Sequence, residues 1–220
     1  MLHILRSWLK DKKAFTLVEV ATVVAIVATL ALTIAPIAQE KILQSKTIKS
    51  ESQIMNLATA IASFFQDTGQ FPTWKGNQKN FFEVLRSGSD ATLDPKFSSG
   101  LSSLWGLTKV DHISNHLLID KPGGEANAYK TAKLDWRGPY IGDVGTDPWG
   151  RNYLVIAKGF FDAGTNTSPI FAWILSGGPN ETVETDIKSQ KLNSTPAENL
   201  STKSDDVGFL LFTATSTLVD

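Results

Sequence analysis

Residues 14–38, AFTLVEVATVVAIVATLALTIAPIA, decide the fold of this chain. The part from Phe15 to Ala38 has 24 residues, and Glu19 is the only charged one among them. At about 1.5 Å of rise per residue, a helix of that length extends about 36 Å and can cross a hydrocarbon core of about 30 Å. The stretch therefore predicts a single membrane-spanning helix.

Basic side chains precede this stretch. Residues 1–14 carry four basic residues against a single acid, Asp11. Positive charge beside a membrane span holds that flank on the cytoplasmic side. We therefore expect a cytoplasmic amino end and an exported carboxyl-terminal body.

Glu19 is unusual at its position. A carboxylate in an otherwise uncharged span is costly unless it finds a partner, and Thr16 offers only a hydrogen bond. A cut between Ala14 and Phe15 would create an α-amine four residues before Glu19. In a bundle of identical helices, the amine of one copy would pair with Glu19 of its neighbour. Glu19 would then be a docking residue that is satisfied only in an assembly.

The run KKAFTLVE, residues 12–19, resembles the class III signal sequence of type IV pilins and of the pseudopilins of type II secretion. The resemblance implies cleavage after Ala14 and N-methylation of Phe15 by a prepilin peptidase. It also implies assembly of the mature helices into a filament core, with Glu19 and Thr16 as assembly residues. Ala14 stands where the family usually has glycine.

The same resemblance implies a place in the cell and a set of partners. The protein would lie in a bacterial inner membrane, with its carboxyl-terminal domain and its filament in the periplasm. Its partners would be further copies of itself, the prepilin peptidase, other pseudopilins and the inner-membrane assembly platform. An ordinary anchor or secretory signal is the simpler alternative, but an anchor needs no Glu19, and a secretory apolar region is about 7–15 residues long.

Composition sets further bounds. The 220 residues suffice for an anchor and one sizeable globular domain. Without residues 1–14 the chain keeps 17 basic and 21 acidic side chains, a net charge of −4, so no basic surplus indicates nucleic-acid binding. Cysteine is absent, whereas type IV pilins commonly close their carboxyl-terminal region with a disulfide. This shifts the resemblance toward pseudopilins.

Residues 39–66 continue the predicted helix into water. Ile54, Leu57, Ile61 and Phe64 recur at three- and four-residue spacing, which predicts a face packed against a globular domain. Residues 67–73, DTGQFPT, end the helix and resemble the junction after the long helix of major pseudopilins. The predicted parts are a leader (1–14), a transmembrane and assembly helix (15–66) and a globular domain (67–220).

Residues 73–136 are harder to interpret. Apolar runs at 81–85 and 101–105 predict short helices between Gly/Ser-rich turns, and much of this region is expected to be an insertion relative to the usual pseudopilin. His112 and His116 have a spacing that places both on one face of a helix. A partly exposed surface helix is favoured over a zinc site, because no cysteine or third histidine follows.

Strand signals return towards the carboxyl end. Residues 147–150, DPWG, have the composition of a type I turn, and strands are predicted at 153–156, 170–175 and 207–212. Three strands after a long helix predict an α+β fold in which an antiparallel sheet packs on that helix. The "GPY…DPWG…Y" pattern also resembles the β-region of the major pseudopilin, far from the leader in sequence.

An oxygen-rich loop, residues 176–186, follows the strand predicted at 170–175, and Asp205 and Asp206 come further along the chain. Two or more carboxylates in such a loop suit calcium, which takes six to eight oxygen ligands in flexible geometry. The matching loop of major pseudopilins binds calcium, and this resemblance makes Asp186, Asp205 and Asp206 the preferred ligands, ahead of Glu181 and Glu184. A solvated acidic loop without metal is the alternative.

No serine-hydrolase, P-loop or dinucleotide-binding pattern is present, which favours a non-enzymatic role. The sequence therefore predicts a structural filament subunit, most closely a major pseudopilin. A minor or true type IV pilin for adhesion or DNA uptake is one alternative. A membrane-anchored periplasmic binding module that never polymerises is another.

Overall fold

The computed structural model describes residues 15–98, 108–131, 134–162, 164–165, 168–186 and 205–213. The chain divides into two compact units between Gln44 and Ser45, inside helix α1 (Leu17–Thr68). The predicted leader, with Ala14, and the short helix predicted at 101–105 lie outside the described residues.

The first unit, which ends at Gln44, contains the apolar part of α1, and this part of the helix continues through Pro36. Its large apolar side chains from Phe15 to Ile37 are between 52% and 85% exposed. Within the described residues, α1 is the one helix that is long and apolar enough to cross a membrane. The candidate membrane-spanning helix predicted from residues 15–38 is therefore present.

The helix ends close to the predicted position. Gly69 has a φ of 63°, and its N–H donates to the carbonyl oxygen of Phe65 at 2.8 Å. Glycine is the residue that takes this left-handed conformation most easily, so it closes the last turn of α1.

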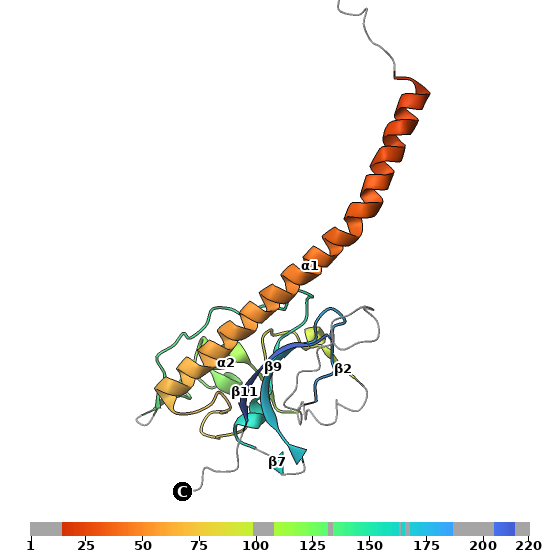
Figure 1. Ribbon diagram of the computed structural model, residues 1–220. Coiled ribbons are helices and arrows are strands. Elements are labelled where there is room, and N and C mark those ends of the chain that lie inside the picture. Colours follow the sequence, from red (N-terminus) through yellow and green to blue (C-terminus); the bar gives the residue numbers. More distant parts are fainter. Residues whose placement is uncertain are drawn as a thin grey trace, which may run out of the picture. The chain divides into compact units, whose positions relative to one another are not determined.

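The second unit contains a five-stranded sheet (Figure 1). Its strand order is β11 (Val207–Thr213), β9 (Phe171–Ser176), β6 (Leu154–Val155), β1 (Val84–Arg86) and β3 (Val110–His112). Neighbouring strands pair antiparallel from β11 to β1, and β1 pairs with β3 in parallel. The predicted α+β fold class is confirmed, with a mixed sheet in place of a purely antiparallel one.

One expectation for residues 73–136 was wrong. The run at 81–85 is not a helix, because Val84 and Leu85 belong to β1, a strand that pairs with both β3 and β6. Residues 73–136 thus supply β1 and β3, two of the five strands of the sheet.

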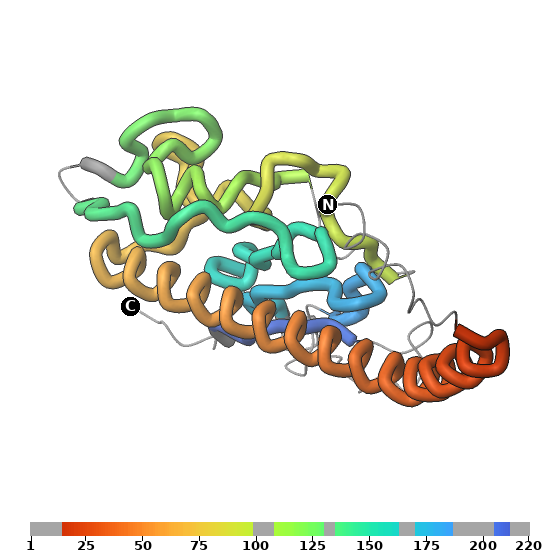
Figure 2. Tube along the Cα trace, turned by 90° about the horizontal axis from the view of Figure 1, so that it is seen from above, coloured from red at the N-terminus to blue at the C-terminus, as the bar shows by residue number. Residues whose placement is uncertain are grey.

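The carboxyl-terminal part of α1 packs on one face of this sheet. Ile54, Leu57, Ile61 and Phe64 share one buried cluster with sheet residues such as Ile174. Figure 2 shows this part of α1, in orange, alongside the blue segments that contain β9 and β11. The predicted packing face of the helix is therefore the core of the second unit.

The opposite face of the sheet is covered as well. Trp173 and Leu175 alternate with Ile174 along β9 and belong to a second buried cluster, which also contains Val183 and against which Phe97 packs. These two residues come from β10 (Thr182–Val183) and β2 (Lys96–Phe97), which form a separate parallel pair. All six residues of β9 are buried, so β9 is the centre of the domain.

The remaining elements are short. They are η1 (Ala91–Leu93), α2 (Ile113–Leu117), η2 (Pro122–Gly124), the hairpin of β4 (Lys130–Thr131) and β5 (Leu134–Asp135), η3 (Ala157–Phe160), and the pair of β7 (Gly164–Thr165) and β8 (Ser168–Pro169).

The predicted turn at 147–150 is present. The N–H of Gly150 donates to the carbonyl oxygen of Asp147 at 3.0 Å, and the Asp147 carboxylate accepts from the N–H groups of Trp149 and Arg151. Its other oxygen accepts from the hydroxyl of Ser176 at the end of β9. The turn is thus fixed to the central strand.

Candidate functional site

Glu19 takes part in a reciprocal cap at the start of α1. Its Oε2 accepts from the backbone N–H of Thr16 at 3.0 Å and from the Thr16 hydroxyl at 2.9 Å. In return, the N–H of Glu19 donates to the Thr16 hydroxyl oxygen at 3.2 Å. A threonine followed three residues later by a glutamate is the capping box, which satisfies backbone donors that the first turn of a helix leaves open.

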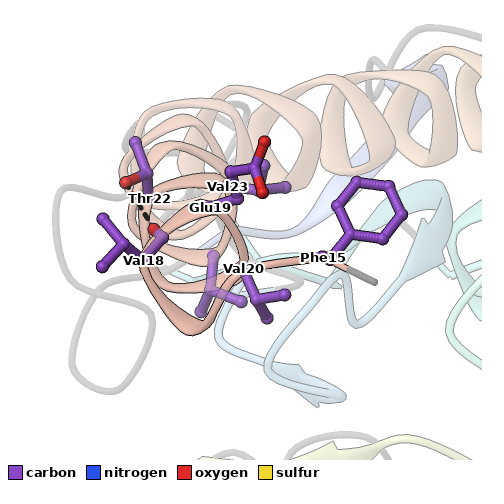
Figure 3. A pocket seen from close by; sticks show the side chains of 7 residues that line it. Phe15, Val18, Glu19, Val20, Thr22 and Val23 are labelled. Carbon is purple, nitrogen blue, oxygen red and sulfur yellow. Dashed lines mark hydrogen bonds between the residues drawn. The ribbon is translucent and has the colours of Figure 1, made fainter. Parts of the chain in front are cut away.

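This cap adds to the role that the sequence suggested for Glu19. The carboxylate helps to begin its own helix through Oε2, and both hydrogen bonds that it accepts within the described residues end on that oxygen. In Figure 3, Glu19 and Phe15 project to one side of the helix and Val18 and Thr22 to the other. The Oε1 atom is therefore available to a group from outside the chain.

The rest of the apolar stretch satisfies its own polar groups. The hydroxyls of Thr22, Thr29 and Thr33 donate to carbonyl oxygens one turn back along α1, at 2.7 to 2.8 Å. Hydroxyls bonded in this way add little polarity to the helix surface. The surface of α1 from residue 17 to residue 38 is accordingly apolar on all sides, and Glu19 carries the charge within these residues.

Two of the predicted calcium ligands meet at the start of β11. The Oδ2 atom of Asp206 accepts from the backbone N–H groups of Glu184 and Thr185, at 3.0 and 2.6 Å, and from the Thr185 hydroxyl at 2.6 Å. The Oδ2 atom of Asp205 accepts from the N–H of Asn180 at 3.2 Å. These bonds tie the loop after β9 to the last strand of the sheet.

Both aspartates are strained electrostatically. Burial, with a smaller contribution from the charge of Glu184, raises the pKa of Asp206 to about 7 and that of Asp205 to about 6. The hydrogen bonds from the loop oppose these increases only in part. In the described residues, Oδ1 of each aspartate is buried and accepts no hydrogen bond.

These carboxylates fit a hard cation in their chemistry. Two buried oxygens without donors, beside a third carboxylate, are what a calcium ion would balance. The described residues contain no set of three or more side chains already arranged as metal ligands. Asp186 is half-buried and follows Thr185, whereas Glu181 forms an ion pair with Arg151.

The two histidines do not form a surface pair. His116 is fully buried, and its two ring nitrogens lie within hydrogen-bonding distance of Asp111 and Tyr129. His112 precedes α2, and its Nδ1 lies 2.8 Å from the carbonyl oxygen of Gly88. The expectation of a partly exposed helix was therefore wrong for His116. Its partner Tyr129 is 13 residues away in sequence, and no local pattern indicates the contact.

Neither a scan against protein-family models nor searches of curated proteins and of solved structures found a match to this chain. The functional interpretation therefore rests on the residues of the chain itself.

Proposed function

We propose that this protein is a structural subunit of a type IV pilin-like filament, most closely a major pseudopilin of a bacterial type II secretion system. The observation that carries the proposal is the capped carboxylate of Glu19 at the start of an exposed apolar helix. Such a helix needs lipid or other helices around it, and a charge inside it indicates a functional partner. The resemblance of residues 12–19 to the prepilin leader indicates that this partner is the new amino terminus of a neighbouring copy.

The proposed assembly begins with cleavage between Ala14 and Phe15. The new amine at Phe15, methylated by the peptidase, would lie near the free Oε1 of Glu19 in a neighbouring copy. Opposite charges in a low-dielectric surrounding attract strongly, so this contact sets the register between stacked helices. Other pseudopilins and an inner-membrane assembly platform complete the proposed set of partners.

The proposed location is a bacterial inner membrane crossed once by the first part of α1. The amino end would be cytoplasmic and the domain that begins after α1 periplasmic, as the basic leader predicts. Growth of a short filament in the periplasm would push exported proteins toward an outer channel, which makes the role mechanical and not catalytic.

Mass spectrometry of the mature amino terminus tests this proposal. The chain is produced in bacteria with and without a prepilin peptidase. We expect a form that begins with N-methylated Phe15 only when the peptidase is present. An intact Met1 in both samples would contradict the filament proposal and favour the anchored binding module. A processed chain that assembles as a surface fibre in place of a short periplasmic one would favour a true pilin.

A bound calcium ion is the second part of the proposal. Asp205 and Asp206 would hold it through their buried Oδ1 atoms, with Asp186 and Glu184 nearby. The ion supplies positive charge that balances the carboxylates at the start of β11.

Calcium is therefore expected to stabilise the folded chain. Addition of Ca²⁺ at about 1 mM should raise the melting temperature of the detergent-solubilised protein by several degrees over a chelator control, because the ion binds the folded state. Asp206→Asn should lose most of this shift. The control Asp143→Asn changes an exposed acid and should keep it. An equal shift in all three proteins, or no shift in the unmodified chain, would contradict the site.

A further inference from the structure

A buried chain of hydrogen bonds surrounds His116 of α2. The Nε2 atom lies 3.1 Å from Oδ2 of Asp111, and Nδ1 lies 2.8 Å from the hydroxyl of Tyr129. That hydroxyl oxygen accepts from the backbone N–H of Trp74 at 3.0 Å. The side chains of His116 and Tyr129 are both fully buried.

Asp111 anchors one end of the chain as an anion. Besides His116, its two oxygens accept from the N–H groups of His112 and Gly123, at 2.8 and 2.7 Å, and from the side-chain amide of Asn115 at 2.7 Å. Burial opposes ionisation, but His116 and these donors hold the pKa of Asp111 below its ordinary value. The carboxylate therefore only accepts hydrogen bonds.

This arrangement fixes the protonation state of His116. Because Asp111 only accepts, Nε2 must carry the hydrogen and donate it. Tyr129 already accepts from Trp74, and its hydroxyl hydrogen finds an acceptor only if Nδ1 carries a lone pair. The neutral form of His116 with its hydrogen on Nε2 therefore satisfies each of these hydrogen-bond donors and acceptors of Asp111, His116 and Tyr129.

A proton added to the Nδ1 lone pair would disturb this arrangement. Nδ1 and the Tyr129 hydroxyl would both be donors facing each other, and a full charge would be buried. Asp111 and, at longer range, Asp120 are the acidic groups that oppose this cost, and the ring of Phe82 faces the imidazole edge to face. The effect of burial is larger than the opposing effect of these carboxylates, so the pKa of His116 lies below its ordinary value.

We propose that the Asp111–His116–Tyr129 chain is a pH-sensitive latch. Neutral His116 holds α2, η2 and the segment after α1 together, and protonation of its Nδ1 in a mildly acidic medium releases them. The latch lies in the second unit and does not depend on the proposed filament role.

The direction of the effect follows from proton linkage. In the open latch, the His116 side chain binds a proton at the ordinary histidine pKa of about 6.5, whereas in the closed latch it binds the proton only at lower pH. Stability of the closed form is therefore full above pH of about 6.5 and falls as the pH decreases below it. Across this window the opening constant should rise about tenfold per pH unit, because one proton is taken up on opening.

Hydrogen exchange of the full chain in detergent measures this opening. Peptides that cover residues 110–131 should lose protection as the pH falls from about 7.5 to about 5.5, after correction for intrinsic exchange. Peptides from β9 serve as the internal reference and should keep their protection. Equal behaviour of both regions would contradict a local latch.

Two variants separate His116 from other titrating groups. The side chain of His116→Gln offers an amide donor to Asp111 and a carbonyl acceptor to Tyr129 but does not titrate, so the loss of protection at low pH should disappear. His112→Gln replaces the partly exposed neighbour and should behave like the unmodified chain. The proposal is overturned if His116→Gln keeps the full pH dependence.

A spectroscopic measurement keeps the test valid if His116→Gln does not fold. Nitrogen-15 NMR of histidine-labelled unmodified chain distinguishes the two neutral tautomers and the imidazolium. At pH of about 6.5, where a free histidine is half protonated, His116 should be neutral with hydrogen on Nε2. An imidazolium or an Nδ1–H tautomer at that pH would overturn the latch.

Discussion

If the proposed filament forms, Glu19→Gln is expected to reduce its assembly by about a hundredfold or more, because the change removes one partner of the proposed ion pair in a low-dielectric surrounding. Glutamine still supplies the side-chain oxygen that a capping box requires, so the helix start should survive. The change therefore tests the charge and not the cap. Assembly is measured in a bacterial host that supplies the prepilin peptidase and the assembly platform, by shearing and quantifying polymer against membrane-bound subunit.

Two further variants identify what Glu19 does. Glu40→Gln removes the next acid of α1, which is exposed beyond the apolar stretch, and should assemble normally. Thr16→Val removes the hydroxyl that donates to Glu19 but leaves the charge, so we expect an intermediate defect. Normal polymer yield from Glu19→Gln would refute the docking role. Equal losses in Glu19→Gln and Glu40→Gln would indicate a general charge effect instead.

Phe64→Ala should destabilise the second unit by about 3–5 kcal/mol, as expected for a large buried aromatic side chain. Phe64 is fully buried and packs edge to face on Tyr129 and Tyr140, at ring distances of 4.8 and 5.5 Å. It therefore joins α1 to segments far along the chain. Urea unfolding of the full chain in detergent, followed by tryptophan fluorescence, gives the free energy.

The neighbouring residue is a matched control. Phe65 is 41% exposed and stacks on Phe71, so Phe65→Ala should cost about 1 kcal/mol or less. Similar losses in both variants would mean that α1 does not pack as described. If Phe64→Ala is too unstable to purify, Phe64→Leu keeps part of the volume and should lie between the control and the alanine variant.

The helix and the last strands were predictable because their signals are local. The spacing of Ile54, Leu57, Ile61 and Phe64 follows one helix face, and the apolar run that contains Ile174 has the length of a buried strand. Gly69 marks the helix end by its conformational freedom alone. In each case the residues that carry the signal are the residues that pack.

The wrong predictions concern residues whose structure depends on contacts with distant parts of the sequence. Val84 and Leu85 carry no alternating pattern, and only pairing with β3 and β6 makes them a strand. The parallel pairing of β1 with β3 cannot be derived from composition, so the sheet was expected to be antiparallel. Sequence distance also hides the buried contact between His116 and Tyr129.

The candidate sites also include one with a local signal and one that depends on distant residues. The capping box of Thr16 and Glu19 is a local motif that the spacing of the two residues already indicates, although the charge of Glu19 is its more obvious feature in the sequence. Asp205 and Asp206 were selected for their chemistry, but the partners that hold them, Asn180 and Thr185, lie more than 20 residues earlier. Such acids can be predicted from their residue type, whereas the residues that contact them are harder to predict from the sequence.

The last strand of the sheet has a consequence for the proposed filament, in which copies would gather at high density. β11 lies at one edge, and its pairing with β9 is irregular between Leu210 and Phe212. Regular edge strands recruit strands of other molecules and can start amyloid-like aggregation, whereas a bulge twists the edge and discourages such growth. In the proposed filament, this bulge would discourage neighbouring copies from pairing through their sheets and would leave the ordered contacts to the helices.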